Sequence, residues 1–521
     1  MSNLIKGFMS IFTNKNKSHI SNSLHASTNS ALQGLENVDS VLSTKNITFR
    51  FCAKKDILTG YSQMFANELK VPIGIVRKDL QRIFDNLQDD LQCCIEYPYV
   101  DEYYRDTYYS YYSRKHFTYG RYCFRISFFS NDVTETNYFV ENFEGKCYGY
   151  MVLRPTPRRI IGYTFMSPKI YKSNKFSICQ CSHQISVMGR KQEISAFPFC
   201  GQDGEMTLCA ETSLVMLFDY FSRRYNKYSR LLPSTIISLH NDYFANKLQP
   251  SRGLDVGTAF SIMNSHGMNT RRIDVSFDDY PADGDVVFDR EQFNNLLHIY
   301  IDSGFPVYAS TQNHSFLIIG RENKLFCQNP QLITVNDTEY PYSKWDESAN
   351  DSIDSFLVPL PENVLLDANK INVSEIYDIF CHESNSTTIL KEGEDYYHRI
   401  YLTTSRAFKQ YIVTSDISDQ SKKTIVSIAM PKFVWVCETI KKYELSNNIN
   451  NIPIISTLLL DATIYPIENN HLLMVKTQDL LILPDENNIG KTEKNYVKIE
   501  SHDVIHPFNN NLKGEHNNWL D

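Results

Sequence analysis

The chain has 521 residues, of which 42% are hydrophobic and 21% are charged, and its formal net charge is −8. This length exceeds what one hydrophobic core usually holds and predicts about three domains. The composition is that of an ordinary globular protein, and the net negative charge disfavours general binding to nucleic acid backbones or to anionic membranes. No apolar run approaches the roughly 18 residues that span a bilayer, so we expect no stable membrane insertion.

Twelve cysteines are spread irregularly over the chain. The first residues, MSNLIKGFMSIFTNKNKS, contain an apolar stretch shorter than a signal peptide needs and no small-residue cleavage site. We therefore expect a cytoplasmic, reducing environment with free thiols rather than disulfides. Most of these cysteines should be small buried hydrophobic residues, so a reactive cysteine must be identified from its surroundings.

The residue pattern divides the chain into four segments. Residues 1–46 are rich in Ser, Asn and Lys and predict a disordered leader. Residues 47–192 mix helical patterns (DLQRIFDNLQDDLQCCI) with strand patterns, which predicts an N-terminal domain of mixed α and β structure. Residues 193–360 carry helical patterns first and strand patterns afterwards, the order typical of an α+β domain. Residues 361–521 hold short β-rich runs such as RIYLTTSRAFKQYIV and predict a mainly β C-terminal domain.

One stretch of the N-terminal domain interleaves aromatic and basic residues. YYRDTYYSYYSRKHFTY has rings for base stacking and cations for phosphates. Tyrosine also has a high β-propensity, and the overall acidity opposes binding to nucleic acid, so we expect no nucleic-acid partner. The following run, RYCFRISF, alternates apolar and polar side chains and predicts a strand with one buried face.

The stretch FPFCGQDGEMTLCAETSLVMLFDYF, residues 197–221, holds two cysteines around a glycine-rich turn. Thr207 is suited to cap a helix, and the apolar residues that follow recur at helical spacing. This places Cys209 in the first helical turn, where free backbone N–H groups and the helix dipole favour a thiolate and lower the thiol pKa. Cys200 lies in an apolar context that has the opposite effect. Cys209 is therefore the candidate nucleophile.

A thiolate nucleophile needs a base, and His314 is the histidine best placed to act as one. It opens the apolar run HSFLIIG directly after a polar turn, so its imidazole can face a cleft. If HSFLIIGRENKLFCQNP forms a hairpin in which Gly320 pairs with Asn323, His314 lies opposite Asn329. Asn329 would then hydrogen-bond to one ring nitrogen and turn the other toward sulfur.

These residues occur in the order found in papain-like cysteine peptidases. The sequence resembles the bacterial leader-peptidase branch of that family. The resemblance lies in the residues Gln202, Cys209, His314 and Asn329 and in the local motifs GFPVYASTQNHSFLIIG and QNP. The resemblance implies a papain-like catalytic domain within residues 193–360. It also implies that Cys209 is the nucleophile, His314 the general acid and base, and Asn329 the orienting residue. Gln202 and the backbone N–H of Cys209 would form the oxyanion hole, although Gln202 lies one residue farther from the cysteine than is usual.

The expected function is hydrolysis of an amide or peptide bond in a protein or peptide substrate, through a covalent acyl-enzyme and without cofactor or metal. Two alternatives are a transglutaminase-like or deamidase-like acyl transfer at the same residues and a catalytically inactive papain-like scaffold that binds other proteins. A zinc site is a third alternative, with Cys179, Cys181 and His183 of CQCSHQ and Cys200 as ligands. A single residue between the first two cysteines suits a strand better than the wider spacing of zinc sites.

Overall fold

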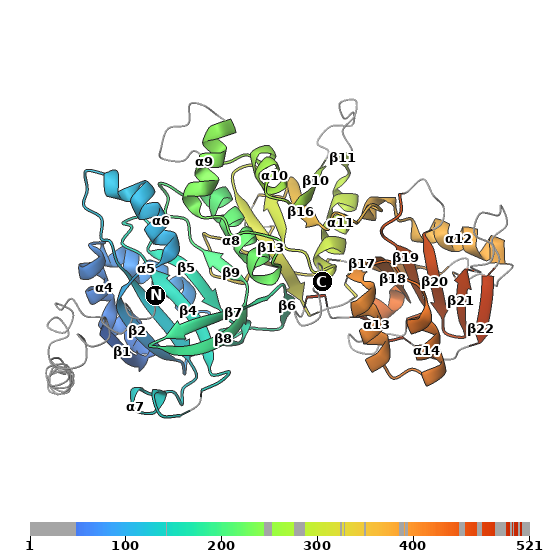
Figure 1. Ribbon diagram of the computed structural model, residues 1–521, viewed down its shortest axis with the longest axis horizontal. Coiled ribbons are helices and arrows are strands. Elements are labelled where there is room, and N and C mark those ends of the chain that lie inside the picture. Colours follow the sequence, from blue (N-terminus) through green and yellow to red (C-terminus); the bar gives the residue numbers. More distant parts are fainter. Residues whose placement is uncertain are drawn as a thin grey trace, which may run out of the picture.

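A computed structural model describes most of the chain between residues 48 and 512. The predicted leader, residues 1–46, lies outside the described residues. Within the described part, the gaps are residues 142, 244–252, 276–286, 324–325, 328, 348–350, 385–389, 391–393, 447–453, 466–470, 485–495, 501–502, 504 and 509–510. The fold is α+β, and its three large, mainly antiparallel sheets follow one another along the long axis of the molecule (Figure 1).

The first sheet has six antiparallel strands. In spatial order they are β1 (Thr48–Ala53), β2 (Gln92–Tyr99), β3 (Cys123–Phe129), β4 (Cys147–Leu153), β5 (Ile161–Met166) and β9 (Pro198–Cys200). The helical segments in this part are α3 (Lys54–Asp56), η2 (Ile57–Tyr61), α4 (Ser62–Leu69), α5 (Ile73–Phe84), α6 (Glu102–Ser110), η3 (Tyr112–Arg114), α7 (Glu135–Tyr138) and η4 (Pro168–Ile170). A separate hairpin pairs β7 (Cys181–Val187) with β8 (Arg190–Ala196).

Strand β3 is buried on both faces, so the prediction of one buried face is wrong. On one face Phe124 packs edge-to-face against Phe65 of α4, with ring centroids 4.8 Å apart. On the other face Arg125 forms a buried ion pair with Glu96 of β2 and donates to the carbonyl oxygen of Ser186 in the β7–β8 hairpin. Arg125, a polar residue of the alternating pattern, is therefore buried against this hairpin, because its guanidinium group is paired with Glu96 and the Ser186 carbonyl oxygen.

The second sheet carries the candidate site. In spatial order its strands are β11 (Val287–Phe288), β10 (Asn269–Val275), β16 (Ser355–Leu360), β12 (Val307–Ser310), β13 (Ser315–Glu322), β14 (Leu332–Val335) and β15 (Ser343–Lys344), and β6 (Phe176–Ile178) also pairs with β13. The helices here are α8 (Cys209–Arg224), α9 (Pro233–Tyr243), α10 (Val256–Ser265) and α11 (Arg290–Asp302).

Two short strands cross the predicted border at residue 192. Strand β6 lies before it and pairs with β13 of the second sheet, whereas β9 lies after it and pairs with β5 of the first sheet. Gly320 of β13 makes the first contact possible, because a Cβ atom there would lie 2.1 Å from the carbonyl oxygen of Ser177. The first two sheets therefore belong to one continuous hydrophobic core.

The third sheet lies in the C-terminal part. Its antiparallel strands are β17 (Tyr396–Thr404), β18 (Phe433–Lys441), β19 (Ser456–Asp461), β20 (Leu472–Thr477), β21 (Leu480–Pro484) and β22 (Tyr496–Glu500). The helical segments are η5 (Ala368–Lys370), α12 (Val373–Ser384), α13 (Ser405–Thr414), α14 (Asp419–Ser427) and η6 (Lys442–Ser446).

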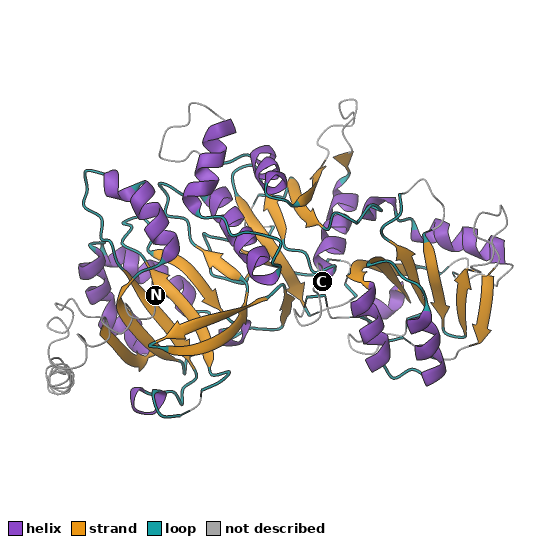
Figure 2. Cartoon of the chain, viewed as in Figure 1, coloured by secondary structure: helices purple, strands orange, loops and turns teal. Residues whose placement is uncertain are grey.

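The helices of the C-terminal part correct the prediction of a mainly β domain (Figure 2). The run RIYLTTSRAFKQYIV leaves its strand at Thr404, whose side chain accepts a hydrogen bond from the backbone N–H of Ala407 and so begins α13. Phe408 and Ile412 then face the core at helical spacing. This part therefore mixes α and β structure.

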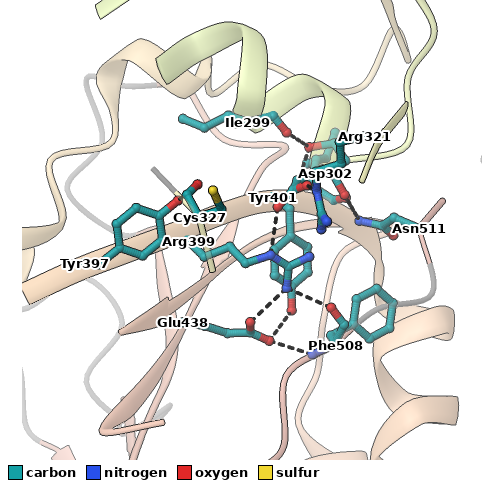
Figure 3. Close-up of polar contacts among 12 residues, drawn as sticks. Ile299, Asp302, Arg321, Cys327, Tyr397, Arg399, Tyr401, Glu438, Phe508 and Asn511 are labelled. Carbon is teal, nitrogen blue, oxygen red and sulfur yellow. Dashed lines mark hydrogen bonds and ion pairs between the residues drawn. The ribbon is translucent and has the colours of Figure 1, made fainter. Parts of the chain in front are cut away.

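A buried network of charges joins the second and third sheets (Figure 3). Asp302, at the end of α11, accepts hydrogen bonds from Arg321 of β13 and, at 2.8 Å, from Arg399 of β17. Arg399 also donates to Glu438 of β18 at 2.9 Å. Burial alone would raise the pKa of Asp302, but the two guanidinium groups outweigh it and hold that pKa below its usual value. The positive charges of Arg321 and Arg399 balance the negative charges of Asp302 and Glu438. The cost of burying each charge is therefore offset by an oppositely charged partner.

Replacing Arg399 by alanine should destabilise the C-terminal part by about 3–5 kcal/mol, because it leaves the buried Glu438 carboxylate without its cation and Asp302 with Arg321 alone. The matched control is Lys441→Ala on the neighbouring strand, where the ion pair with Glu394 is about a third exposed (30% and 34%). We expect a much smaller loss there, because solvent screens this pair. Urea unfolding followed by the fluorescence of Trp435, buried in β18, measures both. Equal losses in the two variants would contradict a special contribution of the buried network.

Candidate active site

Cys209 is the first residue of α8, as the sequence predicts. The predicted cap is wrong, however, because Leu208 and not Thr207 precedes the helix. The Thr207 hydroxyl instead accepts a hydrogen bond from the backbone N–H of Asp203 at 3.3 Å. At the helix start, the Glu211 carboxylate accepts the backbone N–H of Leu208 at 3.2 Å. This is the reciprocal bond of a capping box, in which a carboxylate one turn into the helix accepts the N–H of the residue before it, and it is a different bond from the predicted threonine cap.

The loop that leads to Cys209 is fixed from both ends. Oδ1 of the buried Asp203 accepts the backbone N–H groups of Glu205, Met206 and Thr207 at 2.8–2.9 Å. Before it, the guanidinium of Arg154 donates to the carbonyl oxygen of Gly201 at 2.7 Å. Gln202 lies between these two anchors and is half-buried.

Gly201 has to be a glycine in this loop. A Cβ atom at this position would lie 2.6 Å from the carbonyl oxygen of Ile161, on strand β5. The loop therefore runs tightly along the first sheet just before Gln202. This close approach explains the first glycine of the turn, and a φ of 75°, which favours glycine, explains the second, Gly204.

The thiol of Cys209 is half-buried and lies beside the start of β13. Burial raises the pKa of this thiol to about 11, the Asp337 carboxylate adds to the increase, and hydrogen bonding to the backbone of Ser315 and Ala210 opposes it. The expectation of a lowered pKa at the helix start is therefore wrong. Loss of hydration and a neighbouring negative charge outweigh the helix terminus.

Helix α8 is tied to β13 directly. The hydroxyl of Ser213 donates to the carbonyl oxygen of Cys209 at 2.7 Å and approaches that of Ser315 at 3.3 Å. Because Ser315 follows His314 in the chain, these contacts bring the cysteine and the histidine to the same end of the strand.

His314 lies in a tight turn just before β13. Its backbone N–H donates to the Thr311 hydroxyl at 3.2 Å, and its carbonyl oxygen accepts the Thr311 N–H at 2.8 Å. The imidazole stacks on Phe316, with ring centroids 5.9 Å apart, and Phe316 stacks on Trp345 at 4.2 Å. The ring therefore rests on a buried aromatic pair.

The asparagine that contacts the His314 ring is Asn336 and not Asn329. Oδ1 of Asn336 lies 2.8 Å from Nε2 of His314, whereas Asn329 is exposed in the connection before β14. The predicted hairpin register is wrong, because Gly320 pairs with Ile333 rather than with Asn323. The connection between the strands is longer than the expected turn. The run LITV, which is rich in β-branched residues and ends directly before Asn336, is the sequence signal that places the second strand there.

The contacts of Asn336 also determine the tautomer of His314. The backbone N–H of Thr338 donates to the same Asn336 oxygen at 3.0 Å, which identifies that atom as an acceptor. Nε2 of His314 must then carry the hydrogen of the 2.8 Å contact. In the neutral ring this leaves Nδ1 without a proton, and Nδ1 is therefore the nitrogen able to act as a base.

Asp337 is a further site residue that sequence reasoning missed. Its carboxylate is buried, accepts the hydroxyl of Thr212 at 3.1 Å through Oδ2, and places Oδ1 3.8 Å from Nε2 of His314. Thr212 lies one turn after Cys209 on α8. Burial raises the pKa of Asp337, whereas the His314 imidazole and the Thr212 hydroxyl lower it.

The alternative zinc ligands are not gathered into one cluster. Cys179 donates to the carbonyl oxygen of Gly304 at 3.2 Å, and Cys181 to that of Ala196 at 3.5 Å. His183 contacts the guanidinium of Arg223. Among the described residues, no group of three or more histidine, cysteine and acidic side chains is arranged to hold a metal ion.

No protein-family model matches the chain, and a search of curated proteins finds no similar sequence. None of the helices in the described part of the chain is long and apolar enough to cross a membrane.

The effect of Asp337 on the Cys209 thiol can be measured in a His314→Ala background, where the imidazole no longer takes up the proton. Adding Asp337→Asn should lower the thiol pKa by about one unit, because it removes a nearby negative charge. The pH dependence of Cys209 alkylation by iodoacetamide, followed by peptide mass spectrometry, gives this pKa. Adding Asp132→Asn instead, at an exposed carboxylate (48%) of the N-terminal part, should change nothing. An unchanged or higher pKa with Asp337→Asn would contradict the proximity of carboxylate and thiol.

Proposed function

We propose that the protein is a thiol-dependent amide or peptide hydrolase of the papain-like kind, with Cys209, His314 and Asn336 as its catalytic group. The observation that supports this most is the hydrogen bond of 2.8 Å between Nε2 of His314 and Asn336, made beside the N-terminus of the helix that begins with Cys209. It leaves the unprotonated Nδ1 of the ring to accept the thiol proton.

The proposed reaction begins with a neutral thiol, since burial raises its pKa to about 11. As the sulfur of Cys209 attacks the substrate carbonyl carbon, Nδ1 of His314 takes up its proton. The oxyanion receives hydrogen bonds from the backbone N–H of Cys209 and the side chain of Gln202. The imidazolium then protonates the leaving amine, and a thioester remains. Water attacks this thioester, with His314 as the base, and releases the acid and the free thiol.

The choice between Asn336 and Asn329 gives a direct test. We expect Asn336→Ala to slow the labelling of Cys209 by a peptide vinyl sulfone at neutral pH by about 10²-fold, because a loosely held imidazole is misplaced for proton transfer. His314→Ala should slow it by about 10²-fold or more. Asn329→Ala is the matched control and should label at the wild-type rate. Labelling rates are followed for the Cys209 peptide by mass spectrometry.

Two outcomes would contradict this assignment. If Asn329→Ala slowed labelling as much as Asn336→Ala, the orienting role of Asn336 would be wrong. If His314→Ala left the rate unchanged, His314 would not be the base.

Gln202 is tested separately, because an oxyanion donor acts after the thiol has been activated. Gln202→Ala should leave alkylation of Cys209 by iodoacetamide unchanged and lower the hydrolysis of a fluorogenic peptide-amide library by about 10²–10³-fold. A parallel loss of both rates would instead indicate that the substitution disturbs the loop held by Asp203.

A catalytically inactive binding module is the second candidate, and the raised pKa of the Cys209 thiol favours it. In that case Cys209 should react no faster at neutral pH than a free cysteine, and no member of the peptide library should be cleaved. Fast labelling that depends on His314 would exclude it.

A further inference from the structure

An exposed surface of basic and aromatic residues lies on α6 and the segment that follows it. We call it the tyrosine–basic surface and define it by Arg105, Tyr109, Arg114, Lys115, Phe117 and Arg121, all of them exposed. Tyr109 and Phe117 are exposed by 45% and 54%, unusual values for such large rings. Exposed rings and cations gathered in one place indicate an interaction surface.

The charge of this surface is opposite to that of the whole chain. Between residues 103 and 122 the only acidic residue is Asp106, and its carboxylate is held by the backbone and hydroxyl of Ser234. The chain as a whole carries a net charge of −8. Lys115 already lies 3.6 Å from the Glu205 carboxylate, and the three arginines, concentrated on one surface of an acidic protein, favour an acidic partner.

The tyrosine–basic surface is continuous with the loop that presents Gln202 and Cys209. The Tyr111 hydroxyl donates to the Glu205 carboxylate at 3.2 Å, and Lys115 lies 3.6 Å from the same group. The Ser110 hydroxyl contacts the sulfur of Met206 at 3.6 Å. Glu205 and Met206 are the residues whose backbone N–H groups are fixed by Asp203. A chain bound across this surface would therefore approach the loop directly.

The rings favour a polypeptide over a nucleic acid as the partner. The guanidinium groups of Arg105 and Arg121 lie 5.9 and 5.6 Å from the centre of the Tyr109 ring, and the Lys115 ammonium lies 4.3 Å from that of Tyr111. Phe117 packs edge-to-face on Tyr119. Base stacking needs open ring faces, and two guanidinium groups lie over the ring of Tyr109, the tyrosine of this surface. Guanidinium groups bind carboxylates and phosphates alike, so the preference for a polypeptide rests on the occupied Tyr109 ring and on the net charge of −8, which opposes nucleic acid.

We propose that the tyrosine–basic surface binds an acidic polypeptide segment and thereby selects the substrate of the candidate active site. The substrate-selecting part of this inference rests on the proposed hydrolase function. The acidic side chains pair with Arg105, Arg114 and Arg121, and the chain continues past Glu205 and Met206 toward Cys209. Binding itself does not require catalysis, and this makes the two proposals separable.

Fluorescence anisotropy on the full-length Cys209→Ala protein measures this binding without turnover. The probes are a fluorescein-labelled Glu- and Asp-rich peptide, a neutral Gly- and Ser-rich peptide of equal length, and a single-stranded oligonucleotide of the same net charge as the acidic peptide. We expect the acidic peptide to bind best and its affinity to fall as salt is added. The charge-reversal variant Arg105→Glu, Arg114→Glu, Arg121→Glu should weaken its binding about 10- to 100-fold.

Two further variants keep this test specific. Reversal of three exposed basic residues elsewhere in the same part, Lys55→Glu, Arg77→Glu and Lys78→Glu, matches the change in net charge and should alter affinity less than about twofold. Arg114→Glu alone leaves both cations over Tyr109 in place and should weaken binding about two- to fivefold. It therefore tests the surface even if the triple variant fails to fold.

Several results would overturn the proposal. These are equal binding by the triple variant and its control, equal binding of the acidic and neutral peptides, and tighter binding of the oligonucleotide than of the acidic peptide. The last result would identify a nucleic-acid surface instead. If the acidic peptide binds as expected while wild-type Cys209 shows no His314-dependent labelling, the binding inference stands and the hydrolase proposal fails. If labelling depends on His314 but the acidic peptide does not bind, the hydrolase proposal stands and the binding inference fails.

Discussion

Strand β13 connects the candidate site to the neighbouring parts of the fold. Its first half pairs with β12 and its second half with β6, so that these two strands share one edge, while β14 occupies the other. At its beginning it follows His314, and near its end Arg321 enters the buried charge network with Asp302. A strand has only two edges, and β6, which comes from the N-terminal part of the chain, fills half of one of them. The strand that follows the imidazole is therefore also the strand that receives β6 and that is linked through Asp302 to the third sheet.

The register of β13 has chemical consequences, because a shift by one residue would turn every side chain to the opposite face. In the observed register Asn336 lies just beyond β14, and its oxygen reaches Nε2 of His314. Thr338 fixes that oxygen, and Thr212 fixes the adjacent Asp337. The helix that begins with Cys209, the strand that follows His314 and the strand that precedes Asn336 are thus linked to one another by hydrogen bonds. This degree of support is typical of sites whose geometry has to be maintained.

The sequence predicts the parts of this arrangement that depend on neighbouring residues. It predicts that Cys209 opens a helix and that His314 stands before a strand, because both follow from local periodicity. It does not predict Asn336, because the connection between β13 and β14 is longer than the expected turn and Gly320 pairs with Ile333. Helix α13 was missed because AFKQYIV is equally compatible with a strand, and only the core beneath Phe408 and Ile412 decides between them. The prediction of a lowered thiol pKa is wrong because burial, which raises that pKa, depends on the tertiary structure and not on the neighbouring residues.

The buried Asp337 carboxylate resolves an apparent conflict between the neutral resting thiol and the proposed reaction. It repels a thiolate at Cys209, and it also attracts a positive charge on His314, whose Nε2 is 3.8 Å away. Among the charged groups that act on Asp337, the imidazole has the largest effect. Transfer of the proton from sulfur to Nδ1 therefore creates a cation where the carboxylate stabilises it most. The resting site can thus keep a protonated, weakly reactive thiol and still favour proton transfer once a substrate carbonyl is in place. A cysteine of this kind is protected from general oxidation, which attacks the thiolate, while remaining available to a bound substrate.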